Sequence, residues 1–555
     1  MTAPLTDKVE MQNLLFSELS AMFGKEVPLY DKSLLVNKVC NQEVCSLLSR
    51  LHPGFSMSET QLQKTSGERH GAIRIGKPSE YRWITGFFAA FGMEPHNFYD
   101  MSNVGSKSQP IIATAFRSSR NPEHRIFCSL LVTDYFDPET RARIEKLLAG
   151  REVFSERARE LVLKNQQRGG LDWEDARELI REGVTRIFKW TGRAKDYQLY
   201  QDLCRVGFKI AADIACFEFH HLNHLTPNTL CMDIYTNAMK FCLGEVDRAT
   251  HRSRAEEALR QFRERAGRDY LKLHFKHLSG EEIDGYGRGH VSGADIAEAA
   301  ARLTARLERP ELQLSAFKHS GFKDFTEGPS ADTPVLLRQD AYKALTEPVA
   351  FEQPDGSTVK SEHTARFGEI EQRFYATTPA GRALYDECLA KAEAARAQTP
   401  DLAKKDYAAY QRQYAACFAP FPKTLAELLE QKLVYGLFSV TPRGAAARLE
   451  GSQPSDDLAE LLRLGYVEAD GLRYEDFLPV SAAGIFASNL GQYGTKSTAT
   501  QKPVYSAETL EKIMERRIVD TDALYRQQET ESIDRVRKAL SLAAPAKPQR
   551  HEERV

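Results

Sequence analysis

The sequence lacks the marks of secreted, membrane-spanning and metal-ribbon proteins. Its nine cysteines are scattered and form no CxxC pair, which disfavours disulfide scaffolds and zinc ribbons and suits a reducing compartment. No run approaches the roughly 18 apolar residues of a membrane span. Asp7, Lys8, Glu10 and Glu18 interrupt the N-terminal apolar residues, so no signal peptide is predicted. We expect a soluble, cytoplasmic protein with no membrane partner.

Charge of one sign is not in excess either. The formal net charge is -2 and the pI is about 6.7, so no bulk basic field favours binding to nucleic acid. Hydrophobic residues make up 42% and aromatic residues 10% of the chain, which is enough for a packed interior. A length of 555 residues exceeds one ordinary core and predicts either several domains or one elaborated domain.

Periodicity predicts a mixture of helices and strands. Apolar residues recur at helical spacing over 7–23, and the aromatic-rich segment 81–93 favours a buried helix. Charged helical blocks are expected over 138–190, 244–310 and 383–437, and strands over 69–76, 111–116, 125–132 and 364–374. The pattern alone therefore predicts only a protein of mixed α and β structure.

Three imidazoles gather in one short stretch, at His220, His221 and His224. Histidine is the commonest metal ligand among side chains, but the HExxH arrangement is absent because no glutamate lies between these residues. Pro227 biases Thr226 toward an extended backbone, and an extended chain sends His221 and His224 to opposite faces. We therefore expect one or two of these histidines to bind metal at most, and the others to pack or donate hydrogen bonds.

A better metal site takes one ligand from each of three separate strands. Two histidines and one carboxylate leave three positions of Fe(II) open for a chelating 2-oxo acid and dioxygen. His70, His224 and Glu369 are candidates, and Arg74 shares a strand face with His70, where it could bind a carboxylate in bidentate fashion. Glu371 shares the face of Glu369, so alternation does not choose between the two glutamates. His70 alone could equally be an ordinary core or surface histidine.

Several motifs resemble known enzymes. Phe367-Gly368-Glu369-Ile370-Glu371-Gln372-Arg373 is similar to the metal-glutamate strand of 4-hydroxyphenylpyruvate dioxygenase-type enzymes. Three further segments resemble the 2-oxoadipate dioxygenase/decarboxylase family of the vicinal-oxygen-chelate superfamily: Arg69-His70-x-x-x-Arg74, His221-x-Asn223-His224-Leu225-Thr226-Pro227 and Tyr474-Glu475-Asp476-Phe477-Leu478-Pro479-Val480-Ser481. The resemblance runs from about residue 10 to about residue 530.

The resemblance implies a fold. It predicts an α+β protein in which a curved β-sheet core of the vicinal-oxygen-chelate type encloses a metal and carries extensive helical insertions. We expect one elaborated metalloenzyme domain over 1–543 and a disordered tail over 544–555. Its core strands are expected near 66–132, 219–240, 312–376 and 470–490, and its helical layers over 138–215, 244–310, 383–440 and 505–542.

The resemblance also implies a site and a reaction. His70, His224 and Glu369 would bind Fe(II), with His221 and Asn223 orienting His224. Arg74 would be the catalytic residue that grips a substrate carboxylate, and Val480 and Ser481 would line the substrate pocket. The implied reaction converts 2-oxoadipate and dioxygen to (R)-2-hydroxyglutarate and carbon dioxide in lysine catabolism. No oligomeric state is implied.

Two departures from the family pattern stand out. Phe219-His220 occupies positions where a small residue and a proline are expected, and the segment 244–310 is longer than in compact bacterial members. Neither change touches the expected ligands. Two alternatives stay open: a vicinal-oxygen-chelate metalloenzyme that uses another 2-oxo acid or another metal such as zinc or manganese, and a non-catalytic helical scaffold.

Overall fold

A computed structural model describes residues 4–67, 69–104, 108–317, 326–342, 345–353, 355–364, 366, 368–451, 455–478, 496–500 and 503–542. Its strands are β1 (Arg69–Ile75), β2 (Glu94–Asp100), β3 (Ile111–Arg117), β4 (His124–Leu131), β5 (Arg193–Lys195), β6 (His224–Pro227), β7 (Leu337–Tyr342), β8 (Thr346–Glu352), β9 (Thr358–Thr364), β10 (Gly368–Arg373), β11 (Gly436–Val440) and β12 (Val467–Gly471). Helices make up most of the rest of the described chain, so the fold is α+β, as expected.

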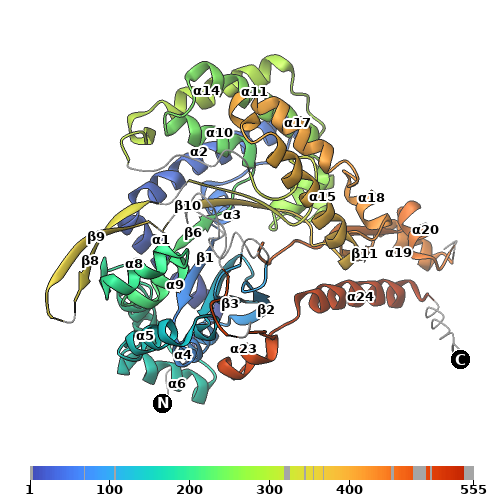
Figure 1. The fold of residues 1–555 in the computed structure, drawn as a ribbon. Helices are drawn as coiled ribbons and strands as arrows, with labels where there is room; N and C mark the ends of the chain where they lie inside the picture. The colour runs from blue at the N-terminus through green and yellow to red at the C-terminus, as the bar shows by residue number, and fades with distance from the viewer. Residues whose placement is uncertain are drawn as a thin grey trace, which may run out of the picture.

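Helices lie above and below the central strands, and the β8–β9 hairpin projects beyond them (Figure 1). Those before β6 are α1 (Lys8–Glu26), α2 (Pro28–Leu51), α3 (Glu59–Ser66), α4 (Pro78–Ala90), α5 (Pro138–Ala149), α6 (Glu156–Arg168), α7 (Trp173–Glu182), α8 (Tyr197–Arg205) and α9 (Lys209–Cys216). Those after β6 are α10 (Met232–Cys242), α11 (Arg248–Arg265), α12 (Arg268–His274), α13 (Gly280–Asp284), α14 (Gly293–Leu307), α15 (Pro379–Gln398), α16 (Leu402–Lys405), α17 (Tyr407–Cys417), α18 (Leu425–Glu430), α19 (Pro442–Leu449), α20 (Leu458–Arg463), α23 (Ala507–Met514) and α24 (Thr521–Leu540).

The main sheet has the strand order β2-β3-β4-β1-β6. Strand β1 runs parallel to β4 and antiparallel to β6, and helix α4 connects β1 to β2. The first half of the core is therefore a strand, a helix and three antiparallel strands, of which the last lies beside the first.

The second half repeats this order. Helix α10 follows β6, and a bridge at Glu327 pairs with Gln339 of β7, which in turn runs antiparallel to β10. Strand β10 then returns beside β6 in parallel, where the Thr229 amide donates to the Glu371 carbonyl at 2.8 Å. Strands β1, β6 and β10 thus lie next to one another at the junction of the two halves.

Local sequence signals explain the helix boundaries. Asp7 caps α1 by accepting hydrogen bonds from the amides of Val9 and Glu10, and Ser58 and Gln61 form a capping box at α3. Apolar residues such as Leu15 and Leu19 of α1 pack into the core cluster that also contains the inner residues of β1, β3 and β4. A second cluster lies among α2, α10, α11 and α14. The two clusters enclose the junction from opposite sides.

Most expected elements form, with one notable correction. The helical blocks over 138–190 and 244–310 and the strands at β1, β3, β4 and β10 are confirmed. The segment 219–240, expected to be core strand, has only the short β6 and then becomes helix α10. Polar residues of α10 do recur at helical spacing, at Asp233, Thr236, Asn237 and Lys240, so the sequence carries a helical period that the strand expectation overlooked.

Two expectations about the chain's environment can be compared with the structure. No helix in the described ranges combines the length and the apolar character needed to cross a membrane. All nine cysteines are free thiols, in agreement with the exclusion of a disulfide scaffold. The tail expected over 544–555 lies outside the described residues.

Candidate metal centre

The three expected metal ligands lie together where β1, β6 and β10 meet. His70 of β1, His224 of β6 and Glu369 of β10 each present a ligand atom, and these atoms all lie within 4.8 Å of one another. The Glu369 Oε2 atom is 3.4 Å from His70 Nε2 and 3.6 Å from His224 Nε2. All three side chains are buried. Two imidazoles and one carboxylate are the donor set of a facial metal triad, so the residues present fit a divalent transition metal.

Strand register explains why two of these residues meet. In the antiparallel pairing of β1 and β6, Ala72 lies opposite His224 and His70 lies opposite Thr226. His70 and His224 therefore occupy diagonal positions on one face, with ring centroids 5.4 Å apart. Gly71 permits this close approach, because a Cβ atom there would lie 3.1 Å from the His224 carbonyl oxygen and 3.0 Å from the Ile126 side chain.

Glu371 lies on the other side of the His70 ring from Glu369. Its Oε2 atom is 2.7 Å from His70 Nδ1, which leaves Nε2 directed at Glu369. A carboxylate that accepts the distal N–H of a histidine fixes the ring orientation and tautomer for metal binding. Burial by itself lowers the pKa of His70, but the charge of Glu371 and hydrogen bonds to both glutamates outweigh it and raise that pKa.

Buried arginines in turn hold Glu371. Arg373 contacts both of its carboxylate oxygens, at 2.8 and 2.9 Å, and Arg125 lies 3.4 Å away. Burial opposes ionisation of Glu371, yet Arg373, His70 and Arg125 hold its pKa well below the usual value. These contacts favour the ionised form of Glu371 beside His70 Nδ1, so the two glutamates of β10 occupy different places around the histidine.

Polar neighbours also hold Glu369. The Thr226 hydroxyl donates to Glu369 Oε2 at 3.0 Å, and the Gln339 side-chain amide donates to the same oxygen. Thr226 comes from β6 and Gln339 from β7, so strands on both sides of β10 fix this carboxylate. These contacts explain how a buried glutamate keeps one orientation.

The three histidines of the stretch 220–224 contact three different carboxylates. His220 Nε2 lies 3.1 Å from Glu80, His221 Nε2 lies 3.2 Å from Asp213, and only His224 faces Glu369. The expected separation of His221 and His224 to opposite directions is thus present. Asn223 donates to the His221 carbonyl at 3.0 Å, so its amide stabilises the backbone just before His224.

Arg74 is buried on the same strand as His70 and makes an ion pair with Asp213. Its Nη1 atom lies 2.7 Å from Asp213 Oδ2. Asp213 also contacts His221 and, at 2.8 Å, His363 of β9, whose other ring nitrogen is 2.8 Å from the Tyr200 hydroxyl. Burial opposes ionisation of Asp213, but His221 and Arg74 hold its pKa well below the usual value. This carboxylate is therefore a fixed anchor for the Arg74 guanidinium.

Known proteins match this chain over nearly its whole length. The family model of 2-oxoadipate dioxygenase/decarboxylase matches residues 15–286 and 274–489. A Pseudomonas putida 2-oxoadipate dioxygenase/decarboxylase is 32% identical over 95% of this chain and 96% of its own length. An Escherichia coli protein of the same name is 31% identical over 94% of this chain and 97% of its own length.

This chain belongs to the 2-oxoadipate dioxygenase/decarboxylase family.

A solved structure extends the similarity to the fold. The crystal structure of hydroxyglutarate synthase from Pseudomonas putida in complex with 2-oxoadipate superposes with a TM-score of 0.67 at 29% identity, covering 98% of this chain and 100% of that one. The membership confirms the resemblance inferred from the motifs, and the family is one of enzymes. A non-catalytic helical scaffold therefore has no support.

The third family motif contacts the candidate metal centre through residues 474–478, which are its described part. The Phe477 ring lies edge-on to His70, with centroids 5.0 Å apart, and the carbonyls of Tyr474 and Asp476 accept hydrogen bonds from Arg373. Val480 and Ser481, the expected pocket-lining residues, lie outside the described residues.

Sequence reasoning missed several residues that support the centre. The residues concerned are Arg125, Asp213, Thr226, Gln339 and His363. Arg373 is a different case, because alternation along 364–374 already predicts that it shares a strand face with Glu369 and Glu371, without showing that it binds Glu371. Asp213 and His363 carry no comparable signal, because the contacts join a helix and a hairpin about 150 positions apart.

Proposed function

We propose that this chain is an Fe(II)-dependent 2-oxoadipate dioxygenase/decarboxylase that converts 2-oxoadipate and dioxygen to (R)-2-hydroxyglutarate and carbon dioxide. The observation that carries the proposal is the buried His70–His224–Glu369 cluster in a member of this family. The six-carbon acid loses its C1 carboxylate as carbon dioxide. One oxygen atom of dioxygen enters the newly formed carboxylate and the other forms the 2-hydroxyl group, so the atoms balance without a further reductant.

The three clustered side chains would hold the metal, with Glu371 orienting His70 and with Thr226 and Gln339 orienting Glu369. When bound, iron supplies the site that chelates the 2-oxo acid and activates dioxygen. The burial of the three ligands supports a site from which bulk water is largely excluded.

Arg74 is the residue we assign to the distal carboxylate of the substrate. Arg74 shares a face of β1 with His70, and a guanidinium matches the two oxygens of a carboxylate. The substrate must present one particular carbon to the metal, and a misplacement of about 1 Å can cost roughly a hundredfold in rate. Held by Asp213, Arg74 would orient the chain of the 2-oxo acid from its far end.

The repeated topology supports a core of the vicinal-oxygen-chelate type. Both halves run strand, helix and antiparallel strands, with the last strand parallel to the first, and the candidate ligands lie where the halves meet. We extend this to the domain proposal: residues 1–543 form one elaborated metalloenzyme domain around that junction. The R configuration, the role in lysine catabolism and the cytoplasmic location stay predictions from the resemblance.

Oxygen consumption with a panel of 2-oxo acids and added Fe(II) tests the activity. We expect turnover with 2-oxoadipate, together with equimolar carbon dioxide and 2-hydroxyglutarate, and no turnover in His70→Ala or His224→Ala. Preference for a different 2-oxo acid would favour the alternative substrate. Full activity with zinc or manganese in place of iron would contradict the assignment of the metal.

A substrate pair isolates the role of Arg74. 2-Oxohexanoate lacks the distal carboxylate of 2-oxoadipate but has the same carbon chain. We expect Arg74→Ala to lower kcat/KM for 2-oxoadipate by about a hundredfold, leaving the low value for 2-oxohexanoate and the iron content unchanged. If both substrates lose activity equally, Arg74 serves the structure rather than the distal carboxylate.

A further inference from the structure

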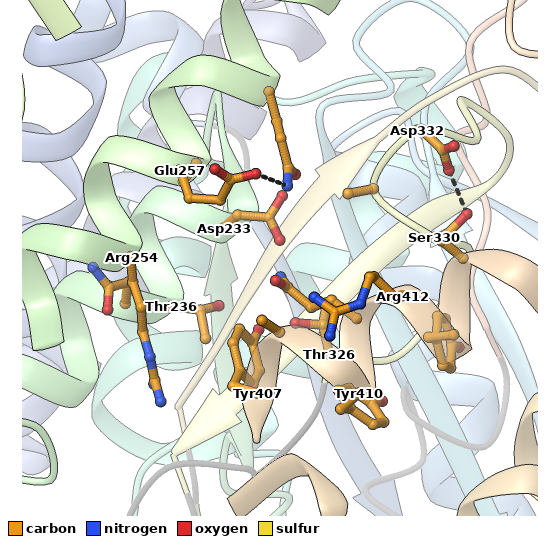
Figure 2. Close-up of a pocket in the computed structure, with 18 of the residues that line it drawn as sticks. Asp233, Thr236, Arg254, Glu257, Thr326, Ser330, Asp332, Tyr407, Tyr410 and Arg412 are labelled. Atoms are coloured by element: carbon orange, nitrogen blue, oxygen red, sulfur yellow. Dashed lines mark hydrogen bonds between the residues drawn. The ribbon is translucent and has the colours of Figure 1, made fainter. Parts of the chain in front are cut away.

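A second site lies on the opposite face of β7 from the metal centre. Along this strand Gln339 points toward Glu369, while its neighbours Arg338 and Asp340 bond to Asp233 and Thr236 of α10 on the other face. On that other face a cavity of about 1030 Å³ opens between α10, α11, α17 and β7. Figure 2 shows Tyr407, Tyr410 and Arg412 projecting from α17 toward this cavity, with Arg254 and Glu257 of α11 across from them. The size suits a metabolite larger than a simple ion.

The carboxylates of this cavity already have partners. Asp233 accepts two hydrogen bonds of 2.9 Å from Arg338, and Glu257 is bound by Arg260. Glu256, Glu264, Asp332 and Asp406 are engaged by Arg252, Arg263, Lys423 and the amide of Ala409, respectively. The acidic groups are therefore neutralised or capped by the protein itself.

Two arginines of the cavity, Arg254 and Arg412, are not paired with a carboxylate of the described residues. Within the described part of the chain, neither guanidinium has a carboxylate within ion-pair distance. Arg254 lies over the Tyr407 ring at 4.8 Å, and the buried Lys240 ammonium lies over the same ring at 5.5 Å. Arg254 and Arg412 are therefore the guanidinium groups of this cavity with which an anionic ligand could pair.

The cavity also offers aromatic surface. Tyr407, Tyr410 and Tyr414 follow one another on α17, with successive ring centroids 6.2 and 5.8 Å apart. Because Lys240 and Arg254 already lie over Tyr407 and Tyr410 is buried, the ring that stays partly exposed to the cavity is that of Tyr414. We propose that this cavity binds an organic phosphate bearing a planar ring, of the nucleoside phosphate class, with its phosphate at Arg254 and Arg412 and its ring against Tyr414.

Calorimetric titration of the full-length protein with AMP, ADP, ATP and inorganic phosphate tests this inference. We expect a nucleotide to bind at one site per chain. Arg254→Gln and Arg412→Gln should each weaken it about tenfold or more, because each removes a charge-assisted hydrogen bond. Arg248→Gln is the matched control, since Arg248 starts the same helix but pairs with Glu308 outside the cavity.

The possible results test nucleotide binding, the role of the ring and the location of the site separately. Absence of nucleotide binding to the wild-type protein would overturn it, as would unchanged affinity in Arg254→Gln. Inorganic phosphate binding as tightly as the nucleotides would overturn the assignment of the ring. Displacement of the nucleotide by 2-oxoadipate would place it in the metal centre instead, whereas simultaneous binding of both supports a separate site. None of these results depends on turnover of 2-oxoadipate.

Discussion

At the residue scale, two glutamates one residue apart on β10 have different tasks. Glu369 lies among the ligand atoms, whereas Glu371 contacts the far nitrogen of His70 and two arginines. The difference comes from their neighbours, since both carboxylates are buried and point to the same face of the strand. The two glutamates are therefore separable by mutation.

We expect Glu371→Gln to weaken binding of Fe(II) or Co(II) about 10- to 100-fold, because His70 loses the carboxylate that orients it. Glu369→Gln should abolish binding. Titration with Co(II), followed by absorption, measures both. Glu475→Gln is the control, because Glu475 also pairs with Arg125 at 3.0 Å without contacting His70. Equal affinities for wild type and Glu371→Gln would contradict the orienting role.

Asp213 is the second residue whose role can be tested alone. We expect Asp213→Asn to raise KM for 2-oxoadipate and to lower kcat/KM up to about a hundredfold, because Arg74 loses its anchor. Metal affinity should not change. Tyr200→Phe is the matched control, since it removes the hydrogen bond to His363 but leaves the Arg74–Asp213 ion pair in place. A loss of metal affinity equal to the loss of kcat/KM would show that the variant disturbs the whole centre.

At the element scale, the pairing of β1 with β6 decides whether the two histidines meet. Gly71 lies at the closest approach of these strands, where an added methyl group would meet the His224 carbonyl and two aliphatic side chains at 3.0 to 3.1 Å. Backbone cannot move aside as a flexible side chain can. The site therefore depends on a residue that binds nothing itself.

Gly71→Ala should lower the free energy of unfolding by about 1 to 3 kcal/mol through overpacking, and should also weaken metal binding. Chemical denaturation and metal titration measure the two effects. Gly150→Ala is the control, because a methyl group there has only one atom within 4 Å, at 3.9 Å. Unchanged stability together with unchanged metal affinity in Gly71→Ala would show that the strands can separate without cost.

At the scale of the whole molecule, the candidate metal centre lies between the two halves of the core. Its candidate ligands come from β1 in the first half and from β6 and β10 in the second, so a metal bound there would link both (Figure 1). A ligand that binds only the folded state stabilises it by mass action. The centre should therefore contribute to the stability of the entire fold.

We expect Fe(II) or Co(II) at a hundred times its Kd to stabilise the metal-free protein by about 2.7 kcal/mol, seen as a rise in Tm. The rise should disappear in His224→Ala and persist in His277→Ala, where an exposed histidine is removed. An equal rise in Tm for His224→Ala would mean that the metal binds elsewhere.

Much of this protein follows from the sequence alone. Local periodicity predicts the strand at 69–75 and the helical blocks. The family motifs stand in one order along the chain, and they predict the family membership. The three candidate ligands could be named in the same way, because each stands inside such a motif.

Only the tertiary structure decided how these residues divide their tasks. The motif resemblance selects Glu369 as the ligand, but neither it nor alternation along β10 shows that Glu371 contacts the far nitrogen of His70, because His70 comes from another strand. Asp213 became the anchor of Arg74 through contacts between segments far apart in sequence. Such contacts leave no local period, since they arise only when separate elements pack around a common centre.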